Sequence, residues 1–179
     1  GINWINEGVF PFESISTHKL ISFKNKLWIY GGTSFSVEFG YNYVSKAIYS
    51  SVDGVNWVKE DELFPIYQYS TINMINYKDK LYRLGAYNGS TGNNTNERHV
   101  YSSSDGLNWI LETENNGFKS KYSFPVTVLN EKMYGFDYEH NTAPIKIKSS
   151  IDGINWEETG SYDSKAQSVA FFTLKNKLI

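Results

Sequence analysis

Short alternating runs of hydrophobic and polar residues follow one another along the whole chain, separated by turn-forming residues. The first run of each unit covers residues 17–23, 71–77, 124–129 and 169–174. A period of two is typical of a strand that buries one face. Each run ends near Asn25, Asp79 or Asn176, residue types that tolerate the positive φ of a tight hairpin. The pattern predicts antiparallel strands joined by hairpins.

Three further strands are predicted after each of these first strands, so that every unit has four. The second strands are expected at 27–30, 81–84 and 133–136, and the third strands at 47–51, 99–103 and 145–149. Glycines should end the second strands, at Gly31 and Gly32, at Gly85 and at Gly135. An Asp-Gly turn then leads into a fourth strand that we expect to carry a tryptophan.

Two short sequence motifs, which we call words, recur in constant order. One is Lys-Asn-Lys-Leu at 24–27, which returns with variations at 78–81, 130–133 and 175–178, and the other is Asp-Gly-x-Asn-Trp. The Asp-Gly-x-Asn-Trp word ends at Trp57, Trp109 and Trp156, its Asn-Trp ending is also found at Trp4, and the interval is about 50 residues. Its aspartates, Asp53, Asp105 and Asp152, should cap the turns, and its tryptophans should lie between neighbouring sheets, a structural role. A four-stranded unit of about 50 residues has the length and strand number of a β-propeller blade.

The repeated words also resemble known propeller repeats. Asn-Lys-Leu-Trp-Ile-Tyr-Gly-Gly at 25–32, followed by Tyr-Ser-Ser-x-Asp-Gly-x-Asn-Trp at 49–57, resembles the kelch-type repeat of bacterial propeller proteins. Ser-x-Asp-Gly-x-Asn-Trp is similar to a shortened sialidase Asp box. The later units depart from the kelch pattern, since the glycine pair becomes Gly85-Ala86 and the Arg-and-His element survives at most as His18. Both resemblances imply an all-β propeller segment of four-stranded antiparallel blades.

The chain contains about three and a half repeats of about 50 residues. We expect the last strand of a preceding blade at 1–8, blades at 9–60, 61–112 and 113–159, and the start of an incomplete blade at 160–179. An open sheet edge exposes unpaired backbone groups. We therefore expect further blades in the same polypeptide, the alternative being a homodimer that completes the ring.

Charge and composition exclude several kinds of partner. The 179 residues carry 17 basic and 19 acidic side chains, without the clustered basic surface that a nucleic acid needs. No apolar run reaches the roughly 20 residues of a membrane span. The absence of cysteine excludes disulfides and thiolate zinc sites. We expect no nucleic-acid partner, no membrane insertion, no metal and no cofactor. An extracellular or cell-envelope location is compatible with these features, but the sequence does not determine the compartment.

The loops between second and third strands differ most between units. They cover 33–46, 87–97 and 137–144, and corresponding loops of a propeller emerge on one face. Aromatic rings among amides and hydroxyls suit a sugar, whose C–H face stacks on a ring. The ligand-binding candidates are Phe39, Tyr41, Tyr43, Tyr87, Asn88, Asn93, Asn94, Arg98 and Tyr138. The alternative is a set of solvated loops whose rings lie against the sheet.

Catalytic groups are not apparent in the sequence. The histidines, His18, His99 and His140, have no metal-ligand spacing. Carboxylates follow the tryptophans, in 60–62, at Glu112 and Glu114, and at Glu157 and Glu158, and we expect them to form solvated connections between blades. A glycosidase needs two carboxylates across the sugar bond, and the sequence does not show that any two face each other.

Two propeller enzyme families imply residues that this chain lacks. Resemblance to sialidases implies three clustered arginines, whereas the chain has only Arg83 and Arg98. Resemblance to galactose oxidase implies a cysteine-linked tyrosine at a copper ion, and there is no cysteine. We therefore expect a non-catalytic recognition module for a protein or a glycan. The alternative is part of a propeller glycan hydrolase, sialidase-like, with its catalytic residues elsewhere.

Overall fold

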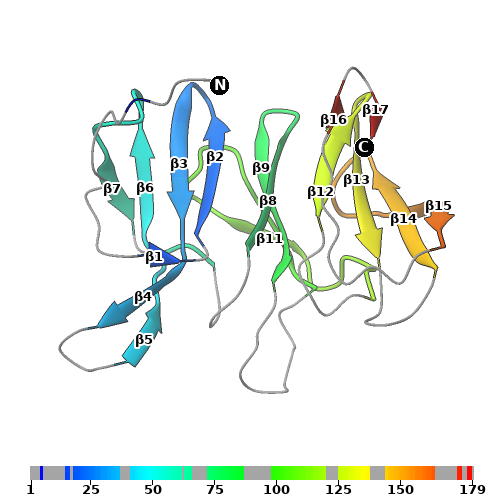
Figure 1. Ribbon diagram of the computed structural model, residues 1–179, viewed down its shortest axis with the longest axis horizontal. Helices are drawn as coiled ribbons and strands as arrows, with labels where there is room; N and C mark the ends of the chain where they lie inside the picture. Colours follow the sequence, from blue (N-terminus) through cyan, green and yellow to red (C-terminus); the bar gives the residue numbers. More distant parts are fainter. Residues whose placement is uncertain are drawn as a thin grey trace.

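The fold consists of β-strands connected by turns and loops (Figure 1). The computed structural model describes residues 5, 15–16, 18–36, 41–61, 63–65, 72–86, 98–119, 125–137, 144–163, 173–174 and 177–178. Every regular element in these residues is a strand. No helix in the described part of the chain is long and apolar enough to cross a membrane.

Three four-stranded antiparallel sheets form the body of the structure, and we call them blades 1, 2 and 3. Blade 1 contains β2 (Lys19–Phe23), β3 (Lys26–Tyr30), β6 (Ile48–Ser51) and β7 (Val58–Asp61). Blade 2 contains β8 (Ile72–Tyr77), β9 (Lys80–Ala86), β10 (Val100–Ser103) and β11 (Ile110–Thr113). Blade 3 contains β12 (Val126–Leu129), β13 (Lys132–Asp137), β14 (Ile145–Ser150) and β15 (Glu157–Tyr162). Within each blade, strands that follow one another in the sequence are neighbours.

The first strands of the blades meet at the centre of the structure. Strand β2 contacts β8, β8 contacts β12, and β12 contacts β16 (Thr173–Leu174), which pairs with β17 (Lys177–Leu178). Figure 1 shows β2, β8 and β12 towards the middle, with the outer strands β7 and β15 at the two sides. Sheets that fan out from a line of first strands form a β-propeller. The prediction of an all-β propeller segment with four-stranded antiparallel blades is confirmed.

The hairpin between first and second strands has the same backbone shape in all three blades. Both central residues have positive φ, for example 49° at Lys24 and 58° at Asn25. This is the pattern of a type I′ turn, whose twist matches that of the flanking strands. In blade 3 the turn residues are Asn130 and Glu131, with φ of 48° and 58°.

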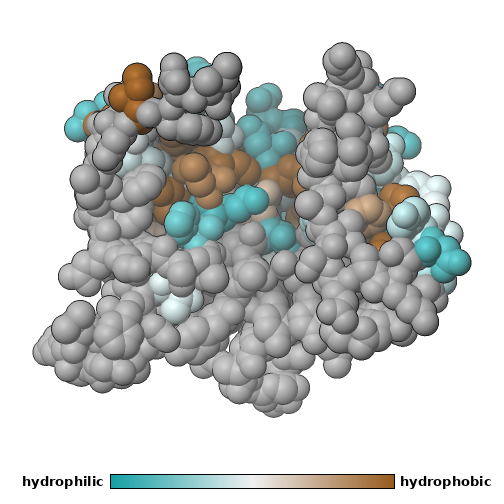
Figure 2. Space-filling model, in the orientation of Figure 1, coloured by the Kyte–Doolittle hydropathy of each residue, from teal (hydrophilic) through white to brown (hydrophobic). Residues whose placement is uncertain are grey.

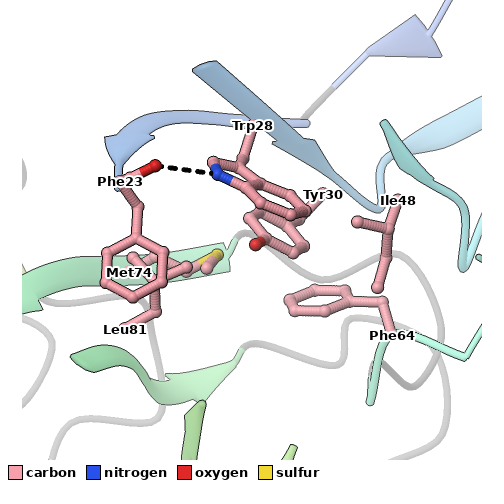
Figure 3. Close-up of a cluster of buried hydrophobic side chains, with 7 residues drawn as sticks. All are labelled: Phe23, Trp28, Tyr30, Ile48, Phe64, Met74 and Leu81. Atoms are coloured by element: carbon pink, nitrogen blue, oxygen red, sulfur yellow. Dashed lines mark hydrogen bonds between the residues drawn. The ribbon is translucent and has the colours of Figure 1, made fainter. Parts of the chain in front are cut away.

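The space between blades 1 and 2 is filled by large apolar side chains, which Figure 3 shows converging from both sheets. The buried members are Phe23, Trp28, Tyr30, Ile48, Phe64, Met74 and Leu81. The indole N–H of Trp28 donates a hydrogen bond of 3.0 Å to the Phe23 carbonyl. Trp109 of blade 2 stands edge-on to Tyr30 and Phe64, with ring centroids 5.5 and 5.3 Å away. Each blade is therefore held by the side chains of the next.

The interface between blades 2 and 3 repeats this arrangement. Its buried residues are Ile75, Tyr77, Tyr82, Leu84, Val100, Phe118 and Met133. Phe118 and Trp156 meet edge-on at 4.9 Å, as Phe64 and Trp109 do in the first interface. The recurrence of the sequence words thus reflects the recurrence of one packing pattern.

Three sequence-based expectations about the strands were wrong. The fourth strands β7, β11 and β15 begin after the tryptophans, so the tryptophans belong to the turns. Gly135 does not end the second strand of blade 3, because it pairs with Lys148 in the middle of β13. The first variable loop is partly regular: β4 (Thr33–Ser36) pairs with β5 (Tyr41–Val44) and with β1 (Ile15–Ser16).

Candidate functional site

The two ends of each blade carry different connections. The type I′ hairpins and the Asp-Gly turns lie at one end, which we call the turn end. The crossings from second to third strand, and from each blade to the next, lie at the opposite end, which we call the loop end. Figure 1 shows β4 and β5 extending below blade 1 on the loop-end side.

A network of hydrogen bonds holds each Asp-Gly turn at the turn end. In blade 2, Oδ1 of Asp105 accepts hydrogen bonds from the backbone N–H groups of Leu107 and Asn108, both at 2.8 Å. Its Oδ2 accepts from Nδ2 of Asn108 at 2.7 Å. The Ser103 hydroxyl donates to Asp105 at 3.0 Å and accepts from the N–H of Gly106 at 2.9 Å. The carboxylate therefore orders the turn.

The equivalent aspartates in blades 1 and 3 have the same surroundings and lowered pKa values. Hydrogen bonds from the side chain and backbone of Asn56 are the largest cause of the low pKa of Asp53. Burial alone would raise the pKa of Asp152, but hydrogen bonds from Asn155 and neighbouring donors outweigh it and lower the pKa to about 2. Groups that stay ionised at neutral pH are poor general acids. This geometry gives the turn aspartates a scaffold role.

Two of the carboxylates that follow the tryptophans lie within strands, not in solvated connections as the sequence suggested. Glu60 is in β7, where its Oε1 accepts a hydrogen bond of 2.5 Å from the Ser50 hydroxyl. Glu112 in β11 accepts the equivalent bond from Ser102 at 2.6 Å. Each carboxylate therefore joins the fourth strand of its blade to the third strand by a side-chain hydrogen bond.

The third carboxylate pair also belongs to a strand. Glu157 and Glu158 are the first two residues of β15. Glu158 forms an ion pair of 2.6 Å with Lys146 of the neighbouring strand. This pair is exposed, so its contribution to the free energy of unfolding is small.

Two ligand-binding candidates from the first variable loop lie in β5. The register places Tyr41 opposite Ser36 and Tyr43 opposite Ser34. Because residues two apart share one face of a strand, the two tyrosine positions fall on the same face of this hairpin.

Arg98 is the other candidate that the structure describes, and it is exposed in the turn before β10 at the loop end. Its carbonyl accepts a hydrogen bond of 2.9 Å from the N–H of Asn116. The remaining candidates lie outside the described residues: Phe39, Tyr87, Asn88, Asn93, Asn94 and Tyr138. The described candidates share an end of the propeller, and their placement on one binding surface stays a prediction.

A buried arginine is the functional candidate that the sequence did not single out. Arg83 in β9 is fully buried, and its guanidinium lies 5.3 Å from the centroid of the Tyr101 ring. The His99 ring is 6.1 Å from that of Tyr101. The positions equivalent to Arg83 in the other blades hold Ile29 and Gly135, so this cation is specific to blade 2. Comparison of the aligned repeats would have revealed it.

The local electrostatics of this cluster act on the histidine. Burial lowers the pKa of His99, Glu114 raises it, and the positive charge of Arg83 lowers it further. A histidine whose pKa is lowered is neutral at physiological pH and can accept or donate a hydrogen bond. The cluster therefore places a buried guanidinium, a phenol ring and an imidazole next to one another in blade 2.

A buried ion pair fastens the crossing from blade 2 to blade 3. Nζ of Lys148 lies 2.8 Å from Oδ2 of Asp137, and both side chains are largely buried. Asp137 also accepts a hydrogen bond of 2.7 Å from the N–H of Lys119, and Lys148 donates one of 2.5 Å to the Gly117 carbonyl. Both contacts of the Asp137 carboxylate therefore stabilise the connection between blades 2 and 3. Within the described ranges, no three histidine, aspartate or glutamate side chains are grouped so as to hold a metal ion.

Comparison with solved structures shows the same fold in proteins of low sequence identity. YjhT superposes with a TM-score of 0.63 at 13% identity, over 89% of this chain and 56% of that one. Zg3597, a family 117 glycoside hydrolase from the marine bacterium Zobellia galactanivorans, gives a TM-score of 0.55 at 14% identity, over 89% of this chain and 50% of that one. The GH32 β-fructofuranosidase BmSUC1 of Bombyx mori gives 0.48 at 15% identity, over 84% and 38%.

These likenesses establish the class of protein as a β-propeller, of which the chain forms a segment of about three blades. The chain spans 56% and 50% of the length of YjhT and Zg3597. No protein-family model matches the chain, and no curated protein sequence matches it either. The likenesses to kelch-type repeats and to Asp boxes therefore remain resemblances of sequence.

Proposed function

We propose that the chain is part of a glycoside hydrolase of β-propeller fold and that its loop end contributes to the sugar-binding surface. The observation that carries this proposal is the likeness in fold to Zg3597, a glycoside hydrolase, over 89% of this chain. The sequence expectation of a non-catalytic module has less support than its alternative, a propeller glycan hydrolase with catalytic residues elsewhere.

The distribution of polar residues supports the loop end as the functional end. The turn end is built from a network that repeats in all three blades, as expected of a scaffold. Blade 2 instead carries Arg83 in the middle of β9, where blades 1 and 3 hold Ile29 and Gly135, and His99 near the loop end, where blade 1 holds Ala47. A residue that departs from the tandem repeat is not required by the shared scaffold, so it can take a role in ligand binding. The backbone register places Tyr41 and Tyr43 on one face of the β4–β5 hairpin, and tyrosine is a residue type that can stack on a sugar.

Binding without hydrolysis is the second candidate function, and the carboxylates favour it. Glycoside hydrolysis generally uses two carboxyl groups that flank the scissile bond. Among the described carboxylates, Glu60 and Glu112 accept serine hydroxyls in outer strands, and Asp137 is paired with Lys148. A catalytic pair would therefore have to include residues other than these three.

Hydrolysis and binding are tested on the same preparation. The polypeptide is incubated with a panel of aryl glycosides and polysaccharides, release of reducing ends is measured, and binding is measured on a glycan array. We expect release from one glycan class, with binding of the same class. Binding without release would favour the second candidate. A folded protein that neither binds nor cleaves any glycan would remove both.

Variants locate the surface once a glycan is found. Tyr41→Ala and Tyr87→Ala are expected to weaken binding by roughly tenfold, because stacking of a ring is worth about 1 kcal/mol or more. Ile110→Ala, on an outer strand of blade 2 and 65% exposed, is the matched control and should bind normally. Equal affinity of all three variants would exclude these tyrosines from the surface.

A further inference from the structure

Two side chains near the centre of the propeller present donor groups that have no partner among the residues that the structure describes. Lys19 is the first residue of β2, at the loop end, and Asn73 is the second residue of β8. We propose that these two side chains form a subsite for an anionic group, a carboxylate or a sulfate ester, on the glycan that the loop end binds. The glycan part of this assignment rests on the proposed function, whereas the anion subsite can be tested by itself.

Lys19 and Asn73 occupy equivalent positions on neighbouring first strands. Strand β2 contacts β8, and Nδ2 of Asn76 donates a hydrogen bond of 3.2 Å to the carbonyl oxygen of Ser22. Ser22 and Asn76 hold equivalent positions in their hairpins. Lys19 and Asn73 each lie three residues nearer the loop end, which is about 10 Å along a strand. The two donors are therefore at one level, near the line where the first strands meet.

The blade scaffold does not require these two side chains. The next position along the first strand is apolar in all three blades, as Leu20, Met74 and Val126. The position of Lys19 and Asn73 holds Pro125 in blade 3. Because this position changes from lysine to asparagine to proline, no packing role is shared by the three blades, and the polar side chains can take a role in ligand binding.

The side-chain amide of Asn73 is a buried donor without an acceptor. Its Nδ2 atom is shielded from solvent and makes no hydrogen bond. The register between β8 and β9 shifts between Ile72 and Met74, at Asn73 itself. An irregularity of this kind re-aims a side chain and is frequent beside functional sites. A buried donor that stays unpaired is costly, and an acceptor oxygen of a ligand would remove that cost.

The ammonium group of Lys19 is partly buried and has no counter-ion in the part of the chain that the structure describes. Burial lowers the pKa of Lys19, and no described carboxylate raises it. An anion beside the ammonium would favour its charged form. Carboxylate and sulfate oxygens accept charge-assisted hydrogen bonds, so either group matches the ammonium of Lys19 and the amide of Asn73 together.

A second positive charge lies close to this pair. Arg83 is buried and pairs with Met74, the residue that follows Asn73. Figure 2 shows hydrophilic side chains at the centre of the molecule, below the hydrophobic surface over β2 and β3 and thus towards the loop end. The positive potential of Arg83 favours a negatively charged ligand group over a neutral one.

NMR titration tests the anion subsite without a glycan polymer. Sodium sulfate and sodium glucuronate are added separately, and the side-chain amide signals of Asn73 and the titration of the Lys19 ε-carbon are followed. We expect at least one anion to shift the Asn73 amide in a saturable way and to raise the pKa of Lys19. The anion that does so identifies sulfate or carboxylate as the group bound.

Variants assign the anion to the subsite. Lys19→Gln should weaken anion binding by about tenfold or more, because a charge-assisted hydrogen bond is lost. Lys24→Gln is the matched control, since Lys24 is exposed at the turn end of the same hairpin, and it should bind as the unaltered protein does. Unchanged Asn73 signals with both anions, or equal affinity of Lys19→Gln and Lys24→Gln, would overturn the subsite.

Glycan arrays separate a failure of this subsite from a failure of the proposed function. Pairs of glycans that differ by one carboxylate or sulfate are compared on the unaltered protein, Lys19→Gln and Asn73→Asp. A preference for the acidic member that both variants lose is the expected result. Equal binding of acidic and neutral members would overturn the acidic-glycan assignment and leave the proposed function standing. Absence of binding to every glycan would remove the proposed function, and the anion titration would then decide on the subsite alone.

Discussion

The hydroxyl of Tyr30 in blade 1 donates a hydrogen bond of 2.9 Å to the carbonyl oxygen of Gly106 in blade 2. Both residues are buried, and the pKa of Tyr30 is raised by burial and by the nearby charges of Asp105 and Glu60, so the phenol stays protonated. The bond joins the second strand of one blade to the Asp-Gly turn of the next. The equivalent second-strand position in blade 2 holds Leu84, which cannot donate such a bond, so the contact between blades 2 and 3 relies on apolar packing at this position.

Removing this hydroxyl should weaken the contact between blades without altering the ring packing. Tyr30→Phe is expected to lower the free energy of unfolding by about 1–3 kcal/mol, because the Gly106 carbonyl loses its buried partner. Urea unfolding followed by tryptophan fluorescence measures the change. Tyr162→Phe, at a tyrosine that is 63% exposed in β15, should change stability little. Equal effects of the two variants would contradict the structural role of the bond.

The turn glycines allow a matched comparison of backbone strain with packing. Gly54 and Gly106 have similar φ values, 79° and 88°, so alanine is strained to a similar degree at both. At position 106 the new Cβ would also meet Tyr30 and Trp28 at about 3 Å, whereas at 54 it meets only Leu27 at 3.4 Å. Gly106→Ala should therefore cost about 1–3 kcal/mol more than Gly54→Ala. Equal losses would show that the blades are not in contact at Gly106.

The turns and hairpins were predictable because each occurs several times. Asp53, Asp105 and Asp152 recur at one position of the repeat. Each accepts the same backbone hydrogen bond in its turn, so the recurrence indicates a local structure that every blade shares. Among the described residues the β4–β5 hairpin follows blade 1 alone, and the sequences of the other variable loops do not resemble it, so no second copy revealed its pairing.

Burial of Arg83 was not predictable for a different reason. It depends on the Tyr101 ring, which lies on the neighbouring strand and is 18 residues away in the sequence. Gly135 was misplaced because a glycine can occupy the middle of a strand as well as its end, and only the pairing with Lys148 distinguishes the two.

Acid should weaken the turns in a defined range of pH. The pKa of Asp152 is about 2 in the folded protein, against an ordinary value of 3.8. The folded state therefore binds fewer protons, and the stabilisation is present above pH 4 and is lost as the pH falls towards 2. Urea unfolding of the unaltered protein and of Asp152→Asn, from pH 6 downwards, measures the difference between them. We expect the difference to shrink on acidification, and a constant difference would contradict the lowered pKa.

The buried arginine should control the titration of its neighbouring histidine. Arg83→Met removes a positive charge and is expected to raise the pKa of His99, whereas Glu114→Gln removes a negative charge and should lower it. Methionine is tolerable because the equivalent position in blade 1 holds Ile29. NMR titration of the His99 ring measures both shifts.

Lys78→Met, in the hairpin at the turn end, is the control for this titration and should leave the His99 midpoint unchanged. Shifts of the same sign in Arg83→Met and Glu114→Gln would contradict the arrangement of charges around His99.

Contact between the turn of one blade and the second strand of the blade before it is the centre of this account, and NOE spectroscopy measures it directly. We predict NOEs from the α-protons of Gly106 to the rings of Trp28 and Tyr30, with ring-current shifts of those protons. The same pattern should appear between Gly153 and Tyr82. Absence of these NOEs in the folded protein, or NOEs from Gly106 to a different sheet, would contradict the propeller arrangement of the blades.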